Sequence, residues 1–152
     1  MASWEEIAAA QTAFADHVRR TFAVRKHATL ATLRRDGSPR ISGTEVEFDE
    51  DGWVYLGMMA GSVKAMDLRR DPRLALHCPT EDPPEDEPAT WLGDGKFAGT
   101  ATEVSDPDQA DGAHRFQIDI TEVVLTRVAP SADHLVIEAW HPDRGLERRE
   151  RW

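Results

Sequence analysis

The spacing of hydrophobic residues changes along the chain from a helical period to a strand period. Ser3 and Glu6 have the form of a capping box, and the apolar residues after them recur at helical spacing, which predicts one helix over residues 3–22. From Thr29 onward the apolar segments are short, alternate with polar residues and are separated by turn signals. The pattern therefore predicts an opening helix followed by mainly β structure.

Turn-forming residues divide the rest of the chain into short strands. Asp36-Gly37 is a hairpin signal, and Gly99 inside a long strand indicates a bulge or a close backbone approach. Strands are expected at residues 29–33, 40–48, 53–58, 73–78, 91–104, 117–128 and 135–140. Short strands joined by turns, with few helices, predict an antiparallel barrel of six or seven strands with helices packed outside it.

Two further helices and one irregular loop are expected between the strands. Gly61-Ser62 opens a helix over residues 63–70, which ends before Pro72. A second, short helix is expected around residues 109–113. The segment 79–90 is rich in proline and acidic residues, which predicts a mobile loop, either a solvated insertion or a lid over a site. All these elements fit a single domain over residues 1–152.

Composition and charge narrow the class of protein. The 152 residues are 40% hydrophobic and 30% charged, as in soluble globular proteins, and no apolar stretch is long enough to cross a bilayer. The chain begins without the features of a secretory signal, and its single cysteine, Cys78, is typical of a reducing compartment, so a cytoplasmic location is expected. The net charge of −10 disfavours nucleic acid and anionic membranes as partners.

The usual signatures of catalytic and metal sites are missing from the sequence. The six histidines show no metal-ligand spacing, and strand alternation would place His77 and Cys78 on opposite faces. No nucleophile elbow, P-loop or Gly-x-Gly-x-x-Gly occurs. We therefore predict no catalytic side chain and no metal ligand.

One segment carries a family resemblance. Residues 61–76, GSVKAMDLRRDPRLAL, together with the turn at residues 36–40, DGSPR, resemble the pyridoxamine 5'-phosphate oxidase-like superfamily of flavin-binding split β-barrels over about residues 24–104. The resemblance implies a homodimer in which FMN, or the related deazaflavin coenzyme, lies at the subunit interface with its phosphate near Ser62 and Lys64. A helix N-terminus with a hydroxyl and an ammonium group nearby suits a phosphate.

The same resemblance suggests which residues contact the cofactor. Short side chains on strand 40–48 would let the flavin ring lie flat, and the two methionines before the phosphate loop would pack along the ribityl chain, although ordinary strand surface and core packing are the alternatives. Trp140 or Trp152 could stack on a ring, whereas the usual interpretation of residues 148–152 is a solvated terminus. The cofactor-binding candidates are Arg40, Ser42, Gly43, Thr44, Met58, Met59, Ser62, Val63, Lys64 and Trp140.

Departures from the oxidase pattern limit the expected chemistry. Val63 stands where the true oxidases have an arginine, and Glu45 and Val46 stand where a basic residue would meet pyridoxal phosphate. Vitamin B6 oxidation is therefore not expected. The resemblance favours an FMN-dependent oxidoreductase that transfers two electrons to or from an unidentified small molecule. The alternatives are a deazaflavin-dependent reductase, a non-enzymatic flavin- or haem-binding protein, and a dimer without ligand.

Overall fold

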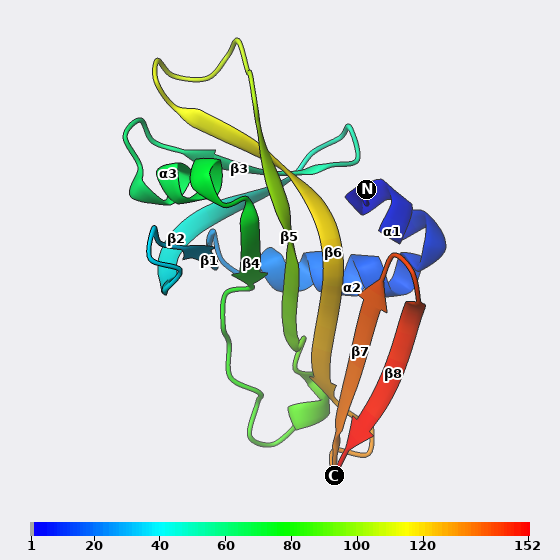
Figure 1. Cartoon of the computed structure of the whole chain (residues 1–152). Helices are drawn as coiled ribbons and strands as arrows, with labels where there is room; N and C mark the ends of the chain where they lie inside the picture. Colours follow the sequence, from blue (N-terminus) through cyan, green and yellow to red (C-terminus); the bar gives the residue numbers. More distant parts are fainter. Residues whose placement is uncertain (1) are drawn as a thin grey trace.

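Six antiparallel strands close into a barrel in the computed structural model, which describes residues 2–152 (Figure 1). The strands are β1 (His27–Leu33), β2 (Pro39–Phe48), β3 (Val54–Met58), β4 (Arg73–His77), β5 (Asp94–Val104) and β6 (His114–Val128). They run in the order β3-β2-β1-β4-β5-β6, and pairing of β3 with β6 closes the ring. The mainly β split-barrel class predicted from the sequence is confirmed.

Two more strands extend the sheet beyond the barrel as a ribbon (Figure 1). β7 (Leu135–His141) pairs with β6, and β8 (Gly145–Arg151) pairs with β7 along its whole length. Residues 148–152 are solvent-exposed as expected, but residues 148–151 are part of β8, and Trp152 stacks on His134 with ring centroids 4.1 Å apart. β8 was missed because its charged side chains carry no hydrophobic alternation.

The expected N-terminal helix is two helices. α1 (Trp4–Ala10) begins with the predicted Ser3–Glu6 capping box, and α2 (Thr12–Phe22) follows after Gln11, whose φ of −141° breaks the helical path. The break lets both helices bury apolar side chains, among them Ile7 of α1 and Val18 of α2. α2 packs against β5 and β6, behind them in Figure 1.

The connections agree with the sequence predictions in part. α3 (Val63–Arg70) has the predicted bounds. The acidic loop, residues 79–90, contains the 3₁₀ helix η1 (Pro88–Thr90). The prediction of a short helix at residues 109–113 was wrong, because these residues form turns. The indole of Trp91 donates a hydrogen bond to the Glu81 carbonyl, 2.8 Å away, across the acidic loop. Mobility of this loop and a lid role stay predictions.

Within residues 2–152, no helix is both long and apolar enough to cross a bilayer.

Gly99 marks both a bulge and a close backbone approach. The register between β5 and β6 shifts between Ala98 and Gly99, which leaves Thr121 of β6 without an opposite residue. A Cβ atom at Gly99 would lie 2.2 Å from the Asp119 carbonyl oxygen, which belongs to the backbone and cannot yield. Only glycine fits at this position.

We therefore expect Gly99→Ala to lower the free energy of unfolding by about 1–3 kcal/mol, the usual cost of forcing an atom into a packed site. Urea unfolding followed by circular dichroism measures the change. Gly57→Ala is the control, because a Cβ at Gly57 meets nothing within 4 Å. Equal stability of the two variants would contradict the assignment of a close approach.

Candidate functional site

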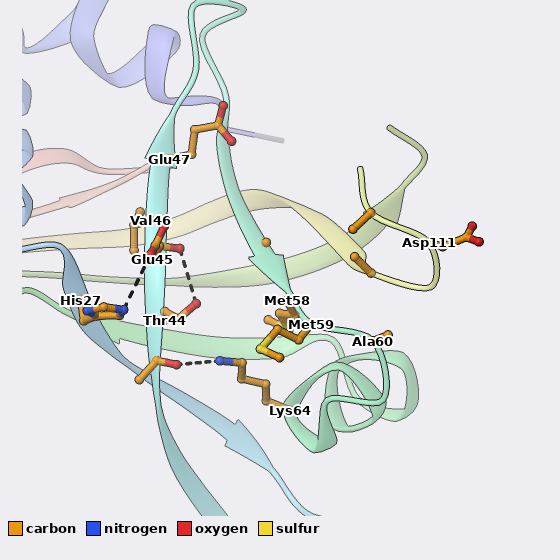
Figure 2. Close-up of a pocket in the computed structure, with 14 residues that line it drawn as sticks. His27, Thr44, Glu45, Val46, Glu47, Met58, Met59, Ala60, Lys64 and Asp111 are labelled. Carbon is orange, nitrogen blue, oxygen red and sulfur yellow. Dashed lines mark hydrogen bonds and ion pairs between the residues drawn. The ribbon is translucent and has the colours of Figure 1, made fainter. Parts of the chain in front are cut away.

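A groove of about 810 Å³ lies between β2 and the start of α3 (Figure 2). β2 lines it with residues 43–47, the end of β3 and the loop after it contribute residues 57–60, and α3 contributes Lys64. His27 of β1 and Asp111 of the β5–β6 connection complete the rim. The volume lies in the range of small-molecule and cofactor sites, roughly 300–1,000 Å³.

Two glycines give the groove an open, flat wall. A Cβ atom built on Gly43 or on Gly57 meets nothing within 4 Å, and neither residue has a positive φ. The backbone therefore does not require glycine at these two positions. Their effect is to leave room beside the strands, which is what a planar ring needs for close approach.

The start of α3 offers polar groups beside this wall. Ser62 is the N-cap residue, but its side chain makes no capping hydrogen bond. The Lys64 ammonium donates to the Gly43 carbonyl at 2.6 Å and so joins α3 to β2, as the dashed line in Figure 2 shows. Burial lowers the pKa of Lys64. An ammonium has three N–H donors, so two remain for a ligand, together with the free N–H groups of the helix start.

A buried carboxylate fixes the position of α3. Asp67 accepts hydrogen bonds from Thr32 Oγ1 (2.8 Å) on β1, Arg40 Nε (2.7 Å) on β2 and Arg70 Nη2 (2.8 Å) on α3 itself. Burial acts to raise the pKa of Asp67, but the hydrogen bonds from Arg40, Arg70 and Thr32 outweigh it, and the pKa lies below its ordinary value. The charged carboxylate thus ties α3 to two strands.

A second ion-pair cluster holds the same helix from the other side. Arg69 donates two hydrogen bonds, of 2.6 and 2.8 Å, to the Glu103 carboxylate on β5. Glu103 also lies 3.0 Å from the His114 ring on β6. The hydrogen bond from Arg69, with a further one from His114, lowers the pKa of Glu103 to about 2. Ser62 and Lys64 are therefore carried by a helix anchored at both sides.

The structure brings only some of the predicted residues into the groove. Those that line it are Gly43, Thr44, Met58, Met59 and Lys64. Ser62 and Val63 flank it at the start of α3. Arg40 instead turns to Asp67, and Ser42 lies on the same face of β2 as Arg40 because strand residues alternate.

Trp140 lies elsewhere. Its side chain is buried in the hydrophobic core, where its neighbours in the sheet are Val123 of β6 and Leu146 of β8. It does not line the groove. The geometry of the chain gives Trp140 a packing role in the core.

Sequence reasoning missed an acidic rim. Glu45 lies 3.4 Å from Lys26 and 3.7 Å from His27, and Glu47 lies 3.3 Å from Arg115. Alternation along β2 could have placed both glutamates on the face of Gly43. Asp111 comes from a distant connection and has no comparable signal in the sequence.

The closed barrel with a groove against a Ser-x-Lys helix start defines a split β-barrel protein. The model of the pyridoxamine 5'-phosphate oxidase family matches residues 14–140, and the chain belongs to this family. A search of curated proteins found no match.

Solved structures share the fold at low sequence identity. A pyridoxamine 5'-phosphate oxidase-related, FMN-binding protein from Nostoc punctiforme is 12% identical, with a TM-score of 0.65, over 99% of this chain and 97% of the other. PhzG from Burkholderia lata, in complex with tetrahydrophenazine-1-carboxylic acid, is 13% identical, with a TM-score of 0.62, over 91% and 87%. HutZ, a haem storage protein from Vibrio cholerae, is 16% identical, with a TM-score of 0.53, over 69% and 88%.

We expect Asp67→Ala to lower the free energy of unfolding by about 3 kcal/mol, because two arginines then lose their buried partner. Chemical unfolding measures this loss. Glu147→Ala is the control, since Glu147 pairs with Arg144 at the exposed surface and should change stability little. If both variants lose the same stability, Asp67 does not anchor α3.

Proposed function

We propose that this protein binds FMN in the groove and uses it to transfer two electrons to or from a small organic molecule. One observation carries the proposal: the side of the groove that Gly43 and Gly57 leave open lies beside the polar start of α3, at Ser62 and Lys64. The family membership and the FMN-binding neighbour support the choice of cofactor.

Each part of the groove has a distinct binding task. The helix N–H groups, the Ser62 hydroxyl and the Lys64 ammonium would hold the phosphate, because a helix start favours an anion. Gly43 and Gly57 would face the ring, and Met58 and Met59 would exclude water from the chain that joins ring and phosphate. FMN supplies the redox chemistry, while the protein binds and orients it and shapes the site.

We expect Gly57→Val to weaken FMN binding at least tenfold without loss of stability, because its side chain enters the groove and meets no protein atom within 4 Å of its Cβ. Ser62→Ala and Lys64→Ala should weaken binding by removing phosphate donors. Fluorescence titration with FMN of protein from which any bound cofactor has been removed (stripped protein) measures the affinity, and thermal melting checks the fold.

Lys96→Ala is the matched control for Lys64→Ala, since Lys96 lies on β5 outside the groove. Wild-type protein that binds no FMN, or groove variants that bind as tightly as wild type, would contradict the proposal. Parallel titration with the deazaflavin coenzyme tests the alternative flavin.

Haem binding is the second candidate function. HutZ and a haem-binding protein from Mycobacterium smegmatis share the fold, and the His27 imidazole lines the groove. Imidazole is a common haem ligand. Titration of the same stripped protein with haem separates the two functions: a haem absorption band lost in His27→Ala would favour haem over FMN.

We further propose that a second copy of the chain covers the groove. Three large apolar side chains are exposed around it: Ile41 (73%), Met59 (84%) and Val63 (56%). Met59 lines the groove, Val63 precedes Lys64, and Ile41 shares the outer face of β2 with Gly43. Apolar exposure of this kind marks an interface, so we propose a homodimer with the cofactor between the subunits.

The expected result is a dimer mass in size-exclusion chromatography with light scattering. Met59→Glu and Val63→Glu should shift the mass towards the monomer and weaken FMN binding, because a buried unpaired carboxylate disfavours the interface. Trp152→Glu is the control, since Trp152 is exposed but lies at the end of β8, away from the groove. A monomeric wild type would refute the homodimer.

A further inference from the structure

Three side chains of types that can bind a metal ion lie close together where the acidic loop (residues 79–90) begins and ends, outside the groove. His77 ends β4, Cys78 follows it, and Asp94 begins β5, so the pair and the aspartate flank the loop on either side. Among the described residues, one ligand atom of each lies within 4.8 Å of the others. Strand alternation would have separated His77 from Cys78, but β4 ends at His77 and the alternation stops there.

The histidine is oriented as a ligand. His77 Nδ1 lies 2.7 Å from the Cys78 carbonyl oxygen, which can only accept a hydrogen bond, so Nδ1 carries the proton. The lone pair is then on Nε2, which faces Asp94 Oδ2 at 4.0 Å. A backbone carbonyl that fixes the ring through its other nitrogen is the usual second partner of a metal-bound histidine.

One oxygen of the Asp94 carboxylate lacks a hydrogen-bond partner among the described residues. Asp94 Oδ1 is buried and makes no hydrogen bond among the described residues. A buried carboxylate oxygen without a donor is costly, and a cation would satisfy it. The sulfur of Cys78 already accepts a hydrogen bond from the Gly95 N–H at 3.3 Å, while burial raises the pKa of the thiol.

We propose that His77 Nε2, Cys78 Sγ and the Asp94 carboxylate bind one zinc-like divalent cation, with water in the fourth position. Zinc takes this mixed nitrogen, sulfur and oxygen set, whereas magnesium and calcium prefer oxygen alone. Tetrahedral zinc needs donors roughly 3.3–3.8 Å apart, so the donor atoms, which lie within 4.8 Å of one another, must approach by up to about 1.5 Å. His77 and Asp94 have side-chain exposures of 40% and 34%, which leaves them free to move and gives the ion an entry path.

The cation would join the two ends of the acidic loop. Cys78 is the last residue before the loop and Asp94 opens the strand after it, so binding removes freedom from the connection between β4 and β5. The thiol releases its proton to water when the metal binds. None of the three residues lines the proposed cofactor groove, so this site does not depend on flavin binding.

Cobalt(II) is the probe, because a cobalt–thiolate bond produces a near-ultraviolet charge-transfer band and tetrahedral cobalt has intense visible bands. Titration of the reduced full-length chain should give one equivalent with both signals, and zinc should displace the cobalt. Cys78→Ser should lose the thiolate band, and His77→Ala and Asp94→Asn should weaken binding by about tenfold or more. Zinc should also raise the melting temperature of the wild type but not of these variants.

His134→Ala is the matched control. His134 forms a histidine–carboxylate pair with Asp133 in the connection between β6 and β7, so this variant should bind cobalt as the wild type does. Absence of the thiolate band in wild type, or an equal loss of affinity in His134→Ala, would overturn the proposal. Circular dichroism without metal verifies the fold, and His77→Ala keeps the test valid if Cys78→Ser does not fold, because His77 is partly exposed.

Discussion

The buried carboxylate of Asp67 is the interaction on which the candidate cofactor site depends. α3 has only eight residues and buries little apolar surface, with Ala65 and Leu68 as its buried hydrophobic side chains. A helix this short is not stable by itself in water, so its position must come from tertiary contacts. Asp67 provides such contacts to both β1 and β2, and these contacts fix the position of the helix start at Ser62 and Lys64.

Closure of the barrel provides the other half of the groove. Pairing of β3 with β6 sets Gly57 opposite Arg115 and Met58 opposite His114, which brings the β5–β6 connection beside the end of β3. The bulge at Gly99 lets β5 and β6 keep their pairing along their length while the sheet bends into a ring. The groove therefore combines residues far apart in the sequence, and a change in register at β3 would move its glycine wall away from Lys64.

Local patterns predicted most of the fold and several residues that line the candidate groove, while long-range pairing decided what the sequence could not show. Gly61-Ser62 and Pro72 predicted the bounds of α3 correctly, and Lys64 was singled out because its motif is contiguous. The destination of Arg40 was not predictable, because both a flavin and the buried Asp67 suit a guanidinium and only the fold chooses between them. The meeting of Cys78 with Asp94 likewise depends on the pairing of β4 with β5.

The uneven charge of the groove would orient the proposed cofactor. The net charge of −10 would repel a phosphate approaching from any side. At one end, however, Lys64 and the helix start offer donors, whereas Glu45 and Glu47 line the part formed by β2. Their pairing with Lys26 and Arg115 reduces the repulsion without making that part attractive to an anion. A phosphate would therefore have one favourable end, and the uncharged ring of the proposed cofactor would occupy the other.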